Sequence, residues 1–102
     1  MMNMRETDSE FLQNCRLDAC DVQTQGLALR IRRELSNLVR GAEVCSDTQF
    51  PAVDSLEAVA FCVSLSDVVN AEVRPEHVPH PHEPVRWVVH RLLNLSKHHS
   101  PR

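Results

Sequence analysis

Residues 54–69 of the chain read DSLEAVAFCVSLSDVV, and this stretch decides the predicted fold. Its apolar residues recur at the three- and four-residue spacing of an α-helix. Asp54 can accept a hydrogen bond from a free amide of the first turn, and Glu57 stands near the positive end of the helix dipole. We therefore predict a helix from about Ser55 to Asn70 with Asp54 as its N-cap.

The predicted helix is apolar on two neighbouring faces. The first face, which we expect to lie in the core, consists of Ala58, Phe61, Cys62, Leu65 and Val69. The second face consists of Leu56, Val59 and Val63. Together the two faces are wider than one core contact requires. A helix of this kind either buries both faces or offers one of them to a partner.

The same periodicity predicts two further helices. The first runs from about Val22 to Val39, and we expect Gly41 to stop it. Its apolar stripe consists of Leu27, Ile31, Leu35 and Leu38. The last helix runs from about Pro84 to Leu95. Its stripe consists of Val85, Val88, Val89, Leu92 and Leu95. We expect Leu35, Leu65 and Leu92 to be buried where the three long helices meet.

The connections between these helices are not periodic. Residues 42–53 form a predicted loop, and we expect the side chains of Val44, Phe50 and Val53 to point into the core. Four prolines between residues 75 and 84 exclude a long regular helix there, although they permit a single turn at residues 75–78. No strand is indicated. The fold class we predict is therefore an all-α bundle of three or four helices, with a long loop before the helix that begins at Ser55.

The two ends of the chain look different from its middle. Residues 1–21 are polar and mixed in charge, and we interpret them as a loosely held extension within which Ser9–Leu12 can start a short helix. The folded domain is predicted to cover residues 22–96, and residues 97–102 form a C-terminal tail.

Composition excludes several classes of function. The chain has 102 residues, 42% of them hydrophobic, which suits one small globular domain. A net charge of −3 argues against a sequence-blind nucleic-acid binder. No apolar run approaches the roughly 20 residues of a membrane span. Because the N-terminus has no secretory pattern, we expect a cytoplasmic protein with reduced cysteines.

For several other side chains we favour a structural or solvent-exposed role over a role in binding or catalysis. Three clustered histidines lie in a proline-rich connection that we expect to be solvated rather than metal-binding: His77, His80 and His82. A solvated helix face, rather than a basic patch, is expected for Arg30, Arg32, Arg33 and Arg40. Trp87 is expected to be a packing anchor, and His90 to lie on the surface. Catalytic motifs are lacking, so we expect neither catalysis nor a metal site.

One position does suggest chemistry. A serine at a helix N-terminus has its hydroxyl beside free backbone amides, which favour a phosphate together with the helix dipole. A phosphate ester on Ser55 would therefore be well placed. The alternative is that Asp54 and Ser55 simply cap the helix.

Residues 27–95 resemble the acyl carrier protein family, which includes peptidyl and aminoacyl carriers. The family's attachment motif D-S-L matches Asp54, Ser55 and Leu56. The family's order of elements also matches: LALRIRRELSNLV, the loop to residue 53, DSLEAVAFCVSL, EVRPEHV and EPVRWVVHRLL. The resemblance implies a small helical bundle of the acyl-carrier-protein type.

The resemblance also implies a function. Ser55 would carry a 4′-phosphopantetheine arm derived from coenzyme A, and the arm's thiol would hold an acyl, polyketide or aminoacyl group as a thioester. Asp54 and Leu56 would flank the attachment point. The expected partners are a phosphopantetheinyl transferase and the enzymes that load and unload the carrier, which is a monomer. The partner-binding residues would be Leu56, Glu57, Val59, Val63 and Asp67.

The sequence departs from the family in ways that affect its role. Ala52 replaces the usual glycine two residues before the aspartate, and Ala60, Ser66 and Val68 stand where fatty-acid carriers have acids. Weaker electrostatic steering favours a specialised biosynthetic pathway over housekeeping fatty acid synthesis. The alternative from another class is a small helical protein-interaction module without a prosthetic group.

Overall fold

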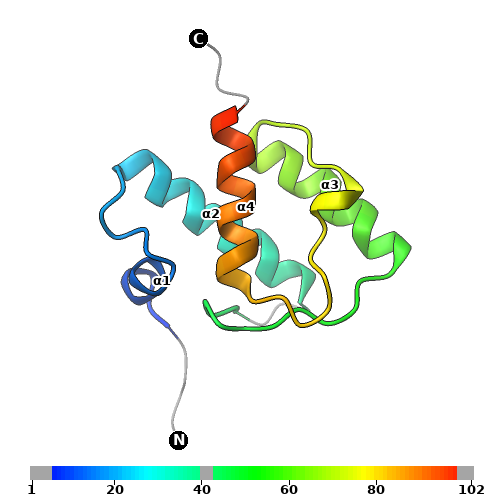
Figure 1. Ribbon diagram of the computed structural model, residues 1–102, viewed down its shortest axis with the longest axis horizontal. Coiled ribbons are helices and arrows are strands. Elements are labelled where there is room, and N and C mark those ends of the chain that lie inside the picture. Colours follow the sequence, from blue (N-terminus) through cyan, green and yellow to red (C-terminus); the bar gives the residue numbers. More distant parts are fainter. Residues whose placement is uncertain (1–5, 40–42, 99–102) are drawn as a thin grey trace, which may run out of the picture.

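The computed structural model describes residues 6–39 and 43–98 (Figure 1). Within these ranges the chain forms four packed α-helices and one short 3-10 helix. In chain order these elements are α1 (Asp8–Asn14), α2 (Val22–Leu38), α3 (Ser55–Val69), η1 (Pro75–His77) and α4 (Val85–His98). The described residues contain no sheet, and their one isolated bridge pairs Gln49 with Pro84. The prediction of an all-α bundle is confirmed.

The hydrophobic core lies where α2, α3 and α4 meet. Leu35, Leu65 and Leu92, one from each helix, are fully buried, as predicted. Figure 1 shows α4 crossing α2, with α3 beside both and α1 at the edge of the bundle. None of the described helices combines the length and apolar character that crossing a membrane requires.

Helix α3 forms for the reasons its sequence suggests. The Asp54 carboxylate accepts a hydrogen bond from the Glu57 amide at 2.8 Å, and the Glu57 carboxylate accepts one from the Asp54 amide at 3.1 Å. This reciprocal capping box satisfies two amides that the helix itself leaves unpaired. The helix ends at Val69, because Asn70 adopts a left-handed conformation with φ 56° that asparagine tolerates.

The other helix boundaries agree with prediction to within a few residues. Helix α2 ends one residue earlier than predicted, and Gly41, its predicted stop, lies outside the described residues. The single turn predicted at residues 75–78 is η1. Helix α4 continues to His98, so residues 97 and 98 of the predicted tail belong to it.

The prediction of a loosely held N-terminal extension is wrong for residues 6–21. A capping box between Thr7 and Glu10 begins α1, and Phe11 in this helix is fully buried in the core. Cys15 and Leu17, which follow α1, are buried as well. The segment is therefore an integral part of the bundle, because it contributes Phe11, Cys15 and Leu17 to the core.

Two side chains differ from prediction in their burial. Arg32, expected to be solvated, is only 3% exposed, because acidic and carbonyl oxygens from distant segments surround it. Trp87, expected to be a packing anchor, is 62% exposed. Successive residues of a helix are rotated by roughly 100°, and the neighbouring Val88 and Val89 occupy the core-facing side of α4.

Candidate functional site

Ser55 is the first residue of α3, and its side chain is exposed to solvent. No hydrogen bond joins its hydroxyl to any residue in the described ranges. The Glu57 amide is taken by Asp54, and the Ala58 amide donates to the Asp54 carbonyl at 2.8 Å. The amides of Ser55 and Leu56 have no acceptor among the described residues. The serine hydroxyl therefore stands beside two available donors at the positive end of a 15-residue helix, a setting that suits a phosphate.

An exposed apolar stripe begins directly beside Ser55 and runs along α3. Leu56 is 81% exposed, Val59 60% and Val63 67%. Their spacing places them on one side of the helix, opposite the fully buried Leu65. The two apolar faces expected from the sequence are thus divided, with one face in the core and the other in solvent. Glu57 and Asp67, the acidic residues assigned to the same partner surface, are also exposed.

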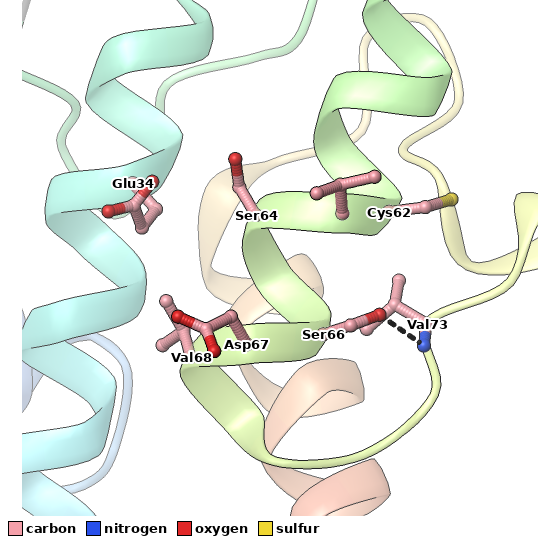
Figure 2. Close-up of a pocket in the computed structure, with 8 residues that line it drawn as sticks. Glu34, Cys62, Ser64, Ser66, Asp67, Val68 and Val73 are labelled. Carbon is pink, nitrogen blue, oxygen red and sulfur yellow. Dashed lines mark hydrogen bonds between the residues drawn. The ribbon is translucent and has the colours of Figure 1, made fainter.

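Two adjoining grooves border this stripe, and Val63 and Val73 line both of them. An apolar groove of about 230 Å³ separates the middle of α3 from the segment after it, and its lining includes Val59, Val63 and Pro75. A wider hollow of about 850 Å³ lies between α2 and α3, with Glu34 and Asp67 at its two sides (Figure 2). Cys62 lies between the two grooves, half-buried.

The segment after α3 is fixed to the helix at this point. The Ser66 hydroxyl accepts a hydrogen bond from the Val73 amide at 2.9 Å, as Figure 2 shows. Val73 itself is buried. The wall of the apolar groove is therefore anchored, and the exposed stripe of α3 lies beside a preformed surface.

A small cavity lies close to the start of α3. It has a volume of only about 30 Å³ and lies between the end of α2, the preceding loop and the first turns of α3. Its lining consists of Leu38, Phe50, Pro51, Val53, Glu57, Phe61 and Pro79. The cavity is far smaller than the grooves on the outer surface of α3. Ser55 does not line this cavity, and its side chain faces solvent.

The loop before Ser55, which we call the site loop (residues 43–53), is fixed from residue 44 to residue 50. Val44 and Phe50 are buried, as predicted, and Val53 is half-buried. The site loop lies antiparallel to the residues that lead into α4, with hydrogen bonds from the Phe50 amide to the Glu83 carbonyl at 3.1 Å and from the Val85 amide to the Thr48 carbonyl at 2.8 Å.

The remaining candidate residues do not assemble into a site. His77 accepts a hydrogen bond from the Arg74 amide at 2.9 Å, whereas His80 and His82 are exposed. The described ranges contain no group of three histidine, cysteine or acidic residues that could hold a metal ion. All four cysteines are free thiols, and burial raises the pKa of Cys15 to about 11.

Sequence reasoning missed a polar network behind the site loop. Its members, Glu6, Asp8, Arg32 and Ser46, come from three separate segments of the chain. Since Glu6 and Ser46 are 40 positions apart, no local pattern links them.

No protein-family model matches the chain, and no curated protein and no solved structure shows significant similarity to it.

Proposed function

We propose that the chain is a carrier protein of the acyl-carrier-protein type, which holds an acyl, polyketide or aminoacyl intermediate on a 4′-phosphopantetheine arm attached to Ser55. The observation that carries the proposal is the placement of Ser55. Its hydroxyl is exposed, has no hydrogen-bond partner among the described residues and stands beside two available amides at the start of α3. The order α2, long loop, α3, η1 and α4 supports the same proposal.

The attachment step makes few demands on the carrier itself. The Ser55 Oγ attacks the phosphorus of coenzyme A that bears the pantetheine group and forms an O–P bond. The pyrophosphate bond of coenzyme A breaks, adenosine 3′,5′-bisphosphate leaves, and the serine proton passes to a base of the transferase. The amides of Ser55 and Leu56 can donate to the new phosphodiester, while the arm's thiol supplies the thioester chemistry. The carrier is not an enzyme in this scheme.

The exposed stripe of α3 is the surface we assign to partner enzymes. Leu56, Val59 and Val63 remain in solvent although they are apolar, so covering them on binding removes apolar surface from water. Glu57 and Asp67 add negative charge beside the stripe. The same surface would serve the transferase and the enzymes that load and unload the arm, with the chain acting as a cytoplasmic monomer.

The acids of α3 are few, which favours a specialised pathway over housekeeping fatty acid synthesis. Ala60 and Ser66 are neutral, and Glu57 and Asp67 are the acids of the helix. Because electrostatic steering depends on such charges, partners that need a strongly acidic helix would associate slowly.

A second candidate function rests on the same stripe without the prosthetic group. The two adjoining grooves beside Val63 make α3 a suitable docking surface for a protein partner. In this alternative Asp54 and Ser55 only cap the helix.

Intact-protein mass separates the two functions. The chain is incubated with coenzyme A and a broad-specificity phosphopantetheinyl transferase, beside Ser55→Ala and the matched control Ser64→Ala, which alters another serine of α3. A carrier gains one phosphopantetheine group in the wild type and in Ser64→Ala, and none in Ser55→Ala. An unchanged wild-type mass refutes the carrier and favours the interaction module.

A further inference from the structure

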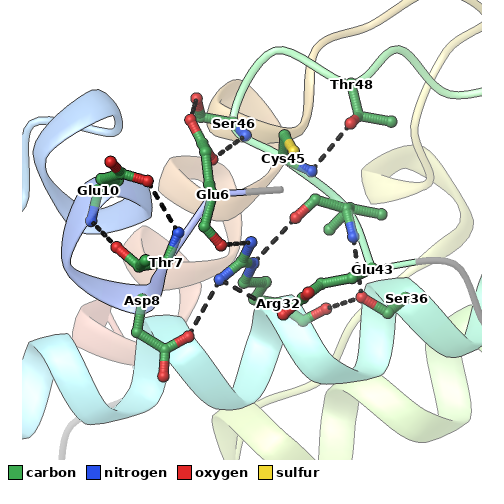
Figure 3. Close-up of polar contacts among 11 residues, drawn as sticks. Glu6, Thr7, Asp8, Glu10, Arg32, Ser36, Glu43, Cys45, Ser46 and Thr48 are labelled. Atoms are coloured by element: carbon green, nitrogen blue, oxygen red, sulfur yellow. Dashed lines mark hydrogen bonds and ion pairs between the residues drawn. The ribbon is translucent and has the colours of Figure 1, made fainter. Parts of the chain in front are cut away.

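Arg32 is a buried cation that joins three segments of the chain (Figure 3). From α2 its guanidinium donates to the Val44 carbonyl of the site loop at 2.9 Å and to the Glu6 carbonyl at 2.9 Å. It also forms an ion pair with Asp8 at 3.0 Å. The Phe11 ring lies against it, with 4.6 Å from the guanidinium carbon to the ring centroid. A buried arginine needs partners of this kind, and here they come from the N-terminal segment and the site loop together.

A second connection joins the same two segments directly. The Glu6 carboxylate accepts hydrogen bonds from the Ser46 amide and from the Ser46 hydroxyl, both at 2.8 Å. Arg32 and Glu43 of the site loop also lie within ion-pair distance, at 3.8 Å. The first half of the site loop is therefore held from one side by residues that lie far from it in the sequence.

The site loop is held from the other side by the first residues of α4 and those just before it. The Arg86 amide donates to the Ser46 carbonyl at 2.9 Å, so Ser46 is fixed by Glu6 on one side and by α4 on the other. Beyond Phe50, the exposed Pro51 and Ala52 lead to Asp54 and the start of α3. The conformation of the loop ahead of Ser55 thus depends on both attachments.

We infer that Glu6, Asp8, Arg32 and Ser46 form a latch through which the N-terminal segment positions the site loop. Arg32 and Glu6 are positioning residues in this assignment, since neither reaches Ser55. The consequence for Ser55 modification rests on the proposed function. The structural part of the inference, that the N-terminal segment restrains residues 43–48, does not depend on the proposed function.

Hydrogen exchange of the full chain tests the latch through a residue that does not touch the loop. Asp8→Asn weakens the Arg32 ion pair and leaves every direct contact of the loop in place. We expect the amides of Val44, Ser46 and Thr48 to exchange about three- to fivefold faster, since the Asp8 side chain is 68% exposed and an ion pair of that exposure contributes a factor of at most about five to an opening equilibrium. The amides of Phe61 and Leu65 should remain within about twofold of wild type, because their exchange follows the global stability of the bundle.

The matched control is Asp18→Asn, which removes an exposed charge from the same N-terminal segment and should leave loop exchange unchanged. Arg32→Lys keeps the charge but loses the planar fork of donors, so it should also accelerate loop exchange. Equal acceleration in the loop and in α3 would show a loss of global stability only and would overturn the latch. Unchanged loop exchange in both latch variants would overturn it too.

The rate of Ser55 modification supplies the functional readout. If the latch positions the loop for the transferase, the initial rate should fall in Asp8→Asn and stay at the wild-type value in Asp18→Asn. Equal rates in the two variants would overturn the link to Ser55. If the wild-type chain is not modified at all, the proposed function fails, and the exchange result alone decides the latch.

Discussion

Replacing Val59 with glutamate places a charge on the exposed stripe of α3 and should leave the fold intact. Val59 is 60% exposed, so two-fifths of its surface is covered in the folded chain. Complete burial of a valine side chain is worth about 1.5–3 kcal/mol. The covered share then corresponds to roughly 0.6–1.2 kcal/mol of unfolding free energy. Glutamate is also a better helix former than valine, which offsets part of this loss.

The assay is urea denaturation followed by far-UV circular dichroism. Val59→Glu should lose no more than about 1 kcal/mol, as ordinary surface substitutions do. The matched variant Leu65→Ala changes the fully buried face of the same helix and should lose about 2–5 kcal/mol. If Val59→Glu loses as much as Leu65→Ala, the stripe is part of the core, and the assignment of a partner surface on α3 is wrong.

Three further predictions concern the N-terminal segment. Phe11→Ala should lower the unfolding free energy by about 3–5 kcal/mol in the same assay, whereas a loose extension would tolerate it. Burial by itself would raise the pKa of Glu6, but hydrogen bonds from Ser46 and Asn14 and the charge of Arg32 outweigh it, so the pKa lies below its ordinary value of 4.5. Glu6 therefore contributes stability that is present above pH 4.5 and lost as the pH falls through the folded-state pKa, and melting curves of Glu6→Gln should show a weaker acid dependence than wild type. Burial raises the pKa of Cys15 to about 11, so alkylation at about pH 8 should label the half-buried Cys20 faster than Cys15. Equal rates of alkylation at the two thiols would place Cys15 at the surface.

The course of α3 could be predicted from sequence because its determinants are local. The capping box of Asp54 and Glu57 spans four residues, and the two apolar faces follow from helical periodicity. The division of those faces between core and solvent also agrees with the periodicity, since Leu56, Val59 and Val63 form one stripe. The placement of Ser55 at the helix start follows directly from the position of its cap.

The N-terminal segment could not be predicted because its stability comes from distant partners. The stretch around Phe11 has too few apolar residues to show a period, and its burial depends on packing against α2. The position of Arg32 has the same origin, since the oxygen atoms around it belong to residues 11 to 26 positions away. Charged residues are seldom buried without such partners, so a solvated arginine was the natural expectation from sequence.

The exposure of Trp87 has an optical consequence. It is the only tryptophan of the chain, and there is no tyrosine. Because its indole already faces solvent in the folded state, the fluorescence of Trp87 reports on the outer surface of α4 and hardly on the core. Intrinsic emission should therefore change little when the bundle melts. A molecule that binds over this part of α4, by contrast, should shift the emission to shorter wavelength. Trp87 is therefore an internal reporter of binding on the side of the molecule where Arg16 and His90 lie.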